Sequence, residues 1–291
     1  MKRPLFWTKD FLSLQADRMQ IIELSIPNTN CRLTFPFHSN GNILKSPGVG
    51  SFGGLYPSEP NLDWNRAWKE LFSNFPKNFS LEVIFPPAYF EPNIFSSQTQ
   101  SLIDAYQPEL IVDVNHHVQI FGEPLALLSK GNRKKFRQFE EAGGEVRRGS
   151  KTDLFEAVLI LEKSRERLGV KLSMSSDQIE NALTLLPERY TLYIAKIGTE
   201  KVASALTVSI TSECLYVLYW GDDAESWRHL SPVTALFTGI YIDAARDGYK
   251  VLDLGTSSVN GELNLGLARF KENLGAIRSP KIKASIKLLE N

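Results

Sequence analysis

The segment Cys214-Leu215-Tyr216-Val217-Leu218-Tyr219-Trp220 constrains the fold most, because it is apolar throughout. A short continuous apolar run of this kind is typical of a central strand that is covered on both faces. Two further strands are expected before it, at Thr191–Ile197 and Val202–Ile210. Gly198-Thr199-Glu200 and Thr211-Ser212-Glu213 provide the tight turns between the three strands. The sequence therefore predicts an antiparallel meander with residues 214–220 near the middle of a sheet.

Elements on both sides of this meander predict a mixed α/β sheet. The expected elements are a strand at Glu145–Arg148, helices at Asp153–Leu168, Ser176–Leu186, Ser231–Arg246 and Leu265–Leu274, a strand at Tyr249–Leu254 and a last strand from Ala276 toward Leu289. Pro232 in the first turn and Asp247-Gly248 at the end are typical helix boundaries for Ser231–Arg246. A meander followed by a crossover helix and a further strand indicates a mixed sheet flanked by helices.

The first part of the chain shows a comparable order of strands and helices. Strands are expected at Ile21–Ile26, Arg32–Phe37, Leu81–Phe85 and Leu110–Ile120, and helices at Leu62–Phe75, Gln98–Tyr106 and Leu125–Ala142. A length of 291 residues suggests about two domains. We therefore expect an N-terminal domain over residues 1–144 and a C-terminal domain over residues 145–291.

Composition excludes several classes of protein. The 33 basic and 33 acidic residues give a net charge of zero, which argues against a dedicated duplex-DNA-binding protein. Two cysteines, Cys31 and Cys214, cannot form a disulfide scaffold or a cysteine-rich zinc site. No segment approaches the roughly 20 apolar residues of a membrane helix, and the first residues do not resemble a signal peptide. We expect a cytoplasmic protein without a membrane span.

Several segments of the second half carry a resemblance to a known family. They are Tyr219-Trp220-Gly221, Ser231-Pro232, the run from Ala244 to Gly255 with its "xDxG" strand, the "GLxxFKxxxG" helix from Gly266 to Gly275, and residues 128–148. In this order they resemble the FemAB-like branch of the GNAT acyltransferase superfamily. The resemblance implies two tandem GNAT-like domains, each with a central mixed sheet flanked by helices, and a cleft between the domains.

The resemblance also implies an activity. GNAT enzymes transfer an acyl group from acyl-CoA to an amine, and Fem-type enzymes use aminoacyl-tRNA to build peptidoglycan cross-bridges. We expect direct attack of an amine on the acyl donor, with acyl-CoA as cofactor and no metal. The expected acceptor is a small or cell-envelope-precursor amine, and tRNA is an alternative partner that is not favoured. The competing hypothesis is a non-catalytic GNAT-like binding module, because the loop Arg228–Val233 keeps the Arg of the family's cofactor loop but lacks its glycines.

The expected site residues fall into three groups. Lys271, Asp253 and Tyr219 are the predicted catalytic residues. Val217, Leu218, Arg228, His229, Ser231 and Thr234 are predicted to bind the cofactor, because a helix N-terminus and an adjacent arginine suit a pyrophosphate. Lys130, Arg133, Arg137 and Phe270 are predicted to contact the substrate, the three basic residues through its phosphates.

Structural roles compete with each of these functional ones. Lys130, Arg133, Lys134 and Arg137 form one helical stripe, which is also typical of a solvated face. Asp253 could instead cap the turn at Gly255, and a helical lysine such as Lys271 is usually solvated. Gly48–Gly53 matches GxGxxG but no helix begins within it, so a loop is expected. His116-His117 lies within a strand and points to both faces, which disfavours a shared metal.

Overall fold

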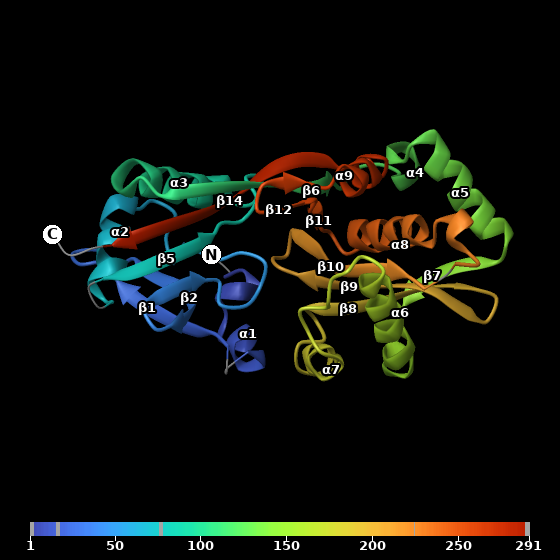
Figure 1. Cartoon of the computed structure of the whole chain (residues 1–291), viewed down its shortest axis with the longest axis horizontal. Coiled ribbons are helices and arrows are strands. Elements are labelled where there is room, and N and C mark those ends of the chain that lie inside the picture. The colour runs from blue at the N-terminus through green and yellow to red at the C-terminus, as the bar shows by residue number, and fades with distance from the viewer. Residues whose placement is uncertain (1–2, 16–17, 76–77, 224, 289–291) are drawn as a thin grey trace. The chain divides into compact units, whose positions relative to one another are not determined.

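The computed structural model describes residues 3–15, 18–75, 78–223 and 225–288, which fold into two compact units (Figure 1). The first unit extends to Asn115 and also contains Thr256–Asn264 and the chain from Ser279 onward. The second unit comprises His116–Gly255 and Leu265–Arg278. Each unit contains strands and helices, and the predicted mixed α/β fold is confirmed.

Contacts divide the chain at a different point from the predicted boundary at residues 144/145. Residues 116–144 pack with the second unit, because Val118, Leu128 and Phe139 are buried in its core. The segments at 256–264 and from 279 onward return to the first unit. Each compact unit therefore consists of more than one segment of the chain. The predicted acyltransferase-like domain over residues 145–291 stays a prediction.

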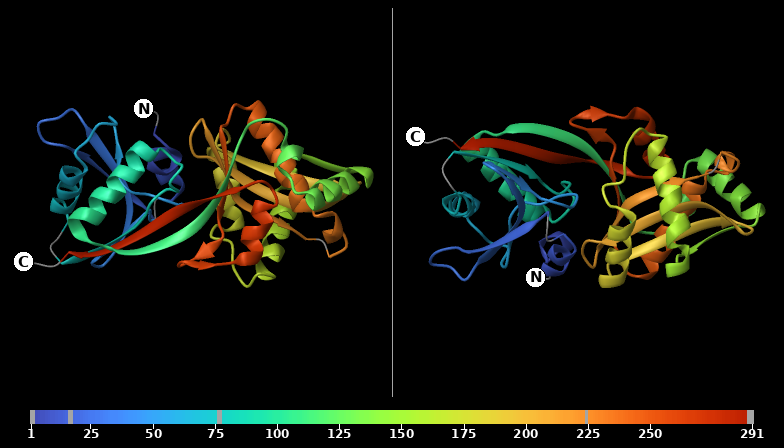
Figure 2. Two further views of the ribbon diagram at one scale, coloured as in Figure 1. Left: turned by 90° about the horizontal axis from the view of Figure 1, so that it is seen from above. Right: turned by 60° about the horizontal axis from the view of Figure 1, so that its bottom comes forward.

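The first unit is built around a sheet of strand order β1-β2-β3-β5-β14-β6, with β4 paired to β2. Its elements are η1 (Leu5–Trp7), α1 (Lys9–Leu14), β1 (Gln20–Ser25), β2 (Arg32–Asn40), β3 (Ile43–Ser46), β4 (Tyr56–Pro57), α2 (Trp64–Ser73), β5 (Phe79–Ile84), α3 (Pro92–Tyr106), β6 (Glu109–Gln119), the hairpin β12 (Ser258–Val259) and β13 (Glu262–Leu263), and β14 (Ile277–Leu288). The long strands β6 and β14 run side by side (Figure 2).

Buried aromatic rings and one buried amide hold the first unit together. The Trp7 Nε1–H donates to Gly54 O at 2.8 Å and the Trp68 Nε1–H donates to Gln98 O at 3.0 Å. The Gln98 side chain donates to Leu55 O and accepts from Leu55 N, at 2.9 and 3.0 Å. Because these two indoles and this amide have hydrogen-bond partners, the bonds offset the cost of burying their polar atoms. The GxGxxG segment is a loop, as expected.

The second unit has the strand order β6-β11-β10-β9-β8-β7. Its further elements are α4 (Pro124–Leu127), α5 (Lys130–Glu141), β7 (Gly144–Arg148), η2 (Lys151–Asp153), α6 (Leu154–Glu166), α7 (Ser176–Leu185), β8 (Tyr190–Ile197), β9 (Glu200–Ser209), β10 (Cys214–Asp222), η3 (Arg228–Leu230), α8 (Pro232–Arg246), β11 (Val251–Thr256) and α9 (Leu265–Glu272). β7 to β10 pair antiparallel, and β10 pairs parallel with β11. The predicted meander and the central position of residues 214–220 are confirmed.

The predicted last strand belongs to the same continuous sheet, where β14 lies between β6 and β5. Its residues Lys283–Leu288 pair antiparallel with β5 of the first unit; Leu289, the predicted end of this strand, lies outside the described residues. One predicted helix is wrong in its extent. The predicted helix Leu125–Ala142 is interrupted at Leu128, whose backbone is extended, and Ser129 then caps α5 by accepting from Asn132 N. Local capping therefore overrides the longer helical pattern.

Helices cover both faces of the second sheet. α8 lies on one face and α6 and α7 on the other (Figure 1). Leu236, Phe237 and Ile240 of α8 are fully buried in one hydrophobic core with Leu215 and Leu252 of the sheet. No helix among the described residues is long and apolar enough to cross a membrane.

Gly239 on α8 provides a test of this packing. A Cβ atom at Gly239 would lie 2.5 Å from Val146 Cγ1 on β7. We expect Gly239→Ala to destabilise the protein by about 1–3 kcal/mol through overpacking, although alanine is the better helix former. Gly131→Ala on α5 is the matched control, because nothing lies within 4 Å of its added Cβ. Urea unfolding should show opposite signs for the two variants, and a stabilised Gly239→Ala would contradict the packing.

Candidate functional site

A β-bulge at Leu218 interrupts the pairing of β10 with β9 in the second sheet. The pairing of β10 with β9 shifts register between Val217 and Tyr219, so Leu218 is the extra residue. The register with β11 covers only three residue pairs and ends at Tyr216 and Asp253, although β10 continues to Asp222. The residues of β10 from Val217 onward are therefore not part of its ladder with β11. Backbone N–H groups at such a position can bind an acyl carbonyl oxygen.

The backbone of Gly255, at the end of β11, forms hydrogen bonds with two buried charged side chains. Asp253 Oδ1 accepts from Gly255 N at 2.8 Å, and the Lys271 ammonium donates to Gly255 O at 2.9 Å. Gly255 has a φ of 75°, and its added Cβ would lie 3.3 Å from Tyr216 Oη. Glycine is required here both by its backbone conformation and by the approach of Tyr216. Asp253 thus caps the turn, which is the structural role that the sequence left open.

Lys271 is not a solvated helical lysine. Only 2% of this residue is exposed, although most lysines are exposed. α9 places it beside the end of β11, while the neighbouring Phe270 packs its ring against Trp220 of β10, with ring centroids 5.8 Å apart. Two adjacent residues of α9 thereby contact the two strands that separate.

Two adjacent histidines on β6 lie close to these groups, and the sequence did not single them out for this site. His116 is fully buried, and its Nε2 lies 3.8 Å from Glu272 Oε1. Burial, and then the positive charge of Lys271, lowers the pKa of His116 to about 4. His117 is also buried and lies near Asp253; burial lowers its pKa and the carboxylate opposes that shift. The only available signal was the His-His pair within a strand.

The predicted cofactor turn precedes α8. Arg228 and His229 are exposed on η3, and His229 Nδ1 lies 3.1 Å from Ser226 O. Ser231 has a left-handed backbone, with φ 51°, where the family loop carries glycine, and its hydroxyl lies 2.8 Å from Thr234 Oγ1. Thr234 N donates to Ser231 O, and Pro232 has no N–H, so this helix start offers fewer donors to an anion than a glycine-rich loop would.

The predicted basic stripe lies on α5. Lys130, Arg133, Lys134 and Arg137 are all exposed, and none forms an ion pair within the described ranges. Like charges three or four residues apart destabilise a helix, and positive charge in its first turn opposes the helix dipole. α5 packs against η3, so the stripe and the turn with Arg228 belong to neighbouring elements. The structure therefore brings the two predicted phosphate-binding groups together.

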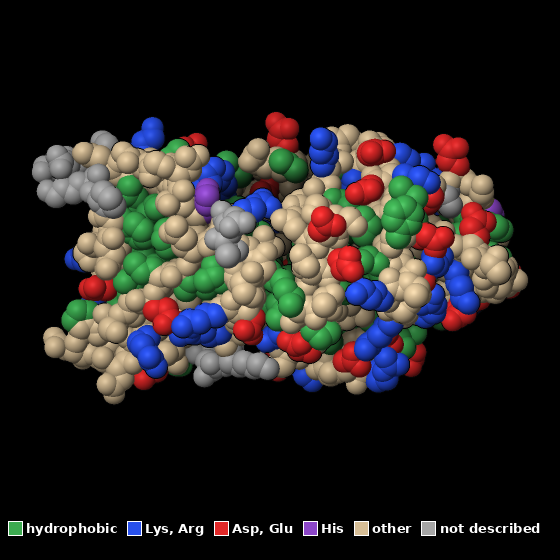
Figure 3. Space-filling model, turned by 90° about the horizontal axis from the view of Figure 1, so that it is seen from below, with side chains coloured by type: hydrophobic (Ala, Val, Ile, Leu, Met, Phe, Trp, Pro, Cys, Tyr) green, Lys and Arg blue, Asp and Glu red, His purple; other side chains and the backbone are tan. Residues whose placement is uncertain are grey.

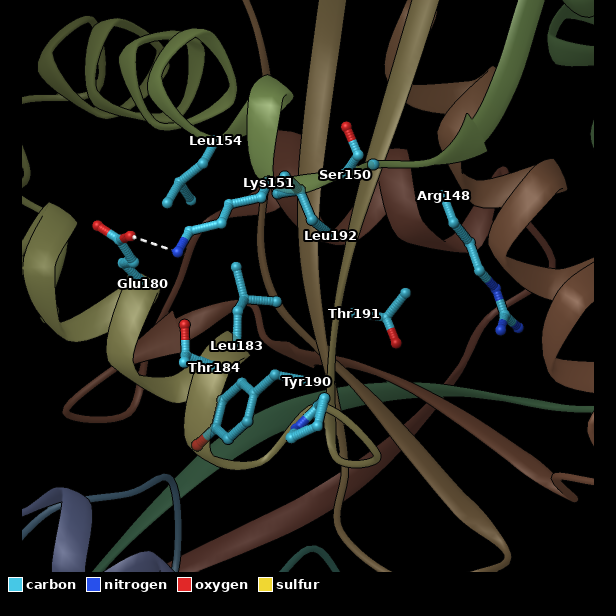
Figure 4. Close-up of a pocket in the computed structure, with 12 residues that line it drawn as sticks. Arg148, Ser150, Lys151, Leu154, Glu180, Leu183, Thr184, Tyr190, Thr191 and Leu192 are labelled. Atoms are coloured by element: carbon cyan, nitrogen blue, oxygen red, sulfur yellow. Dashed lines mark ion pairs between the residues drawn. The ribbon is translucent and has the colours of Figure 1, made fainter.

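A separate cavity of about 460 Å³ lies between α7 and the start of β8 (Figure 4). Apolar side chains, among them Leu183 and Tyr190, form part of its wall. An ion pair joins Lys151 and Glu180 at 3.5 Å on one side of it. None of the predicted catalytic, cofactor-binding or substrate-binding residues lines this cavity. Among the described residues no cluster of three or more His, Cys, Asp or Glu side chains could hold a metal.

Residues 129–272 match the model of the acetyltransferase (GNAT) domain. This segment contains the bulged strand, the turn before α8, the "xDxG" strand and all of α9. The chain therefore carries a domain of the GNAT superfamily. Among curated proteins, none matches the sequence.

Solved structures with the same fold support the FemAB-like assignment. FemX superposes with a TM-score of 0.68 at 13% identity, covering 96% of this chain and 91% of its own. L-PGS from Bacillus licheniformis gives 0.57 at 14% identity, with 91% and 83% coverage. A tandem GNAT protein from the clavulanic acid biosynthesis pathway gives 0.51 at 8% identity, with 94% and 85% coverage. At these identities the similarity concerns the fold, which is that of tandem GNAT-like proteins.

The buried neutral His116 predicts a pH effect on stability. Its folded pKa of about 4 is below its unfolded value of about 6.5, so the unfolded chain binds a proton first as the pH falls. This contribution is fully present above pH 6.5 and is lost as the pH falls toward 4. We expect wild type to lose about 2–3 kcal/mol more than His116→Gln over this interval. Urea unfolding at pH 7 and pH 4.5 measures the difference, and equal losses would show that His116 is not buried as neutral imidazole.

Proposed function

We propose that the protein transfers an acyl group to an amine, with the acyl carbonyl bound where β10 separates from β11. The observation that carries this proposal is the bulge at Leu218 combined with the end of the β10–β11 ladder at Tyr216 and Asp253. Fixed N–H groups in a sheet stabilise a developing oxyanion without reorganisation. The GNAT domain match over residues 129–272 supports the same class of reaction.

The proposed chemistry is a direct displacement. The amine nitrogen bonds to the carbonyl carbon and the carbonyl oxygen gains negative charge. The carbonyl then re-forms as the bond to the thioester sulfur or ribose oxygen breaks, and the proton that the amine loses balances the one that the leaving thiol or hydroxyl gains. Lys271 is proposed to stabilise negative charge near the transferred group, since its ammonium is already fixed at Gly255 O. Tyr219 lies one residue beyond the bulge and is 5% exposed. Asp253 contributes by fixing the Gly255 turn.

Acyl-CoA is the proposed donor. Val217 and Leu218 would bind its acyl arm, while Arg228, His229, Ser231 and Thr234 would surround its pyrophosphate. An aminoacyl-tRNA is the alternative donor, because the unpaired stripe on α5 adjoins η3 and could bind further phosphates. FemX and a putative lysylphosphatidylglycerol synthetase share the fold, which supports a cell-envelope precursor as acceptor.

A binding module without catalysis is the second candidate. The left-handed serine and the proline at the start of α8 favour it, because both reduce the fit to a pyrophosphate. Such a module would bind a donor or acceptor without turnover. Because its cofactor site would be degenerate, such a module would not bind acetyl-CoA in preference to other nucleotides, so the two candidates differ in donor affinity as well as in turnover.

Donor binding can be tested by calorimetry with acetyl-CoA. We expect saturable binding that exceeds that of ATP, and a roughly tenfold or greater loss in Arg228→Ala, because a charge-assisted phosphate contact is removed. The affinity of wild type should also fall more steeply with salt than that of the variant. Arg246→Ala at the far end of α8 is the control. Equal affinities and salt slopes in wild type and Arg228→Ala would reject the turn as the phosphate site.

Lys271 can be tested once an acceptor amine supports turnover. We expect Lys271→Met to lower kcat by about 10²–10³ while acetyl-CoA affinity stays within about twofold, because the charge acts on the developing oxyanion. Circular dichroism and thermal unfolding must show a folded variant. Lys250→Met, on an exposed residue before β11, is the matched control. An unchanged kcat in folded Lys271→Met would leave the lysine with only its structural bond to Gly255.

A further inference from the structure

Arg165 on α6 is the exception in a run of paired cations. Lys163 pairs with Asp223 at 2.9 Å, and Arg167 pairs with Asp222 at 2.6 Å. On the side of the molecule drawn in Figure 3, Lys and Arg side chains lie interspersed with Asp and Glu side chains. Arg165, between these two pairs, forms no ion pair within the part of the chain that the structure describes, and its Nε is buried without a hydrogen-bond partner there.

The surroundings of Arg165 are hydroxyl groups rather than carboxylates. Its guanidinium lies 5.6 Å from the centre of the Tyr219 ring. The Tyr219 hydroxyl in turn hydrogen-bonds the hydroxyl of Ser173, which follows α6. α6, the following loop and β10 thus bring the Arg165 guanidinium together with the Tyr219 phenol and the Ser173 hydroxyl.

A guanidinium stays charged at every physiological pH, and a buried N–H donor without an acceptor is unfavourable. Arg165 is partly buried, and its guanidinium carbon lies within cation–π range of the Tyr219 ring. The planar donors of a guanidinium match the two oxygens of a carboxylate or a phosphate. The hydroxyls of Tyr219 and Ser173 can donate to the same oxygens. The cluster therefore has the composition of an anion-binding site.

We propose that Arg165, with the hydroxyls of Tyr219 and Ser173, binds a carboxylate or phosphate group of the amine acceptor. The assignment to the acceptor rests on the proposed function, because Tyr219 adjoins the bulge at which the acyl carbonyl would lie. The acceptor is then an anionic amine, such as an amino acid, a peptide end or an amino compound carrying a phosphate. Simple alkylamines without an anionic group are poor acceptors.

The test uses the Nε–H resonance of Arg165 in nitrogen-15 NMR spectra, assigned by its absence in Arg165→Lys. Inorganic phosphate and succinate are the two probes, and sodium chloride at equal ionic strength is the control. We expect a saturable shift with at least one probe and none with chloride. The probe that shifts the resonance identifies the group as phosphate or carboxylate. No saturable shift with either probe, or the same shift with chloride, would overturn the proposal.

A variant series separates this site from the donor site. Arg165→Lys and Arg165→Met should weaken binding of the effective probe roughly tenfold or more, whereas Arg246→Met, on an exposed residue of α8, should not. Acetyl-CoA affinity should stay within about twofold in all folded variants. Anion binding without acetyl-CoA binding would reject acetyl-CoA as the donor but keep the anion site. Acetyl-CoA binding without an anion shift would reject the anion site alone.

Discussion

The separation of β10 from β11 is the constraint on which the candidate site depends. Two parallel strands that stayed hydrogen-bonded along their length would use every backbone donor of β10 in the sheet. The ladder instead stops at Tyr216 and Asp253, and the bulge at Leu218 follows at once. A bulge increases local twist, and the left-handed Gly255 turns the end of β11. Both features coincide with the end of the ladder between the two strands.

Two buried charged side chains, Asp253 and Lys271, lie at the end of β11, and backbone atoms of Gly255 are their hydrogen-bond partners. Asp253 and Lys271 both bind the backbone of Gly255, which donates its N–H to Asp253 and accepts from Lys271 at its carbonyl. Both peptide groups of this residue are therefore fixed, and neither can shift without disrupting a buried charged hydrogen bond. The same contacts keep a lysine ammonium fixed beside the opened strand. Structural and catalytic interpretations of Lys271 are therefore compatible, because a fixed charge is the one that stabilises an oxyanion best.

The sequence predicted the fold of the second unit well because its signals are local. An apolar run marked β10, and Pro232 with Asp247-Gly248 marked α8, and both elements occur. The partner of the last strand could not be predicted, since β14 continues from one unit into the other and no local signal records pairing with β5. The break at Leu128 was also missed, because a charged helix that follows a leucine-rich turn has the same periodicity as one longer helix.

The candidate site was predictable only where a motif or a family resemblance marked it. Lys271 and Asp253 were found through the "xDxG" and "GLxxFKxxxG" patterns, but their burial was not, since a helical lysine is ordinarily exposed. Arg165 is two residues from both Lys163 and Arg167, so the helical period turns it away from the face that these two residues share. The sequence does not show what lies on each side: Asp222 and Asp223 pair with Arg167 and Lys163, whereas Arg165 lies beside Tyr219. Whether a cation has an ion-pair partner depends on tertiary structure, so the sequence alone could not identify Arg165 as part of this site.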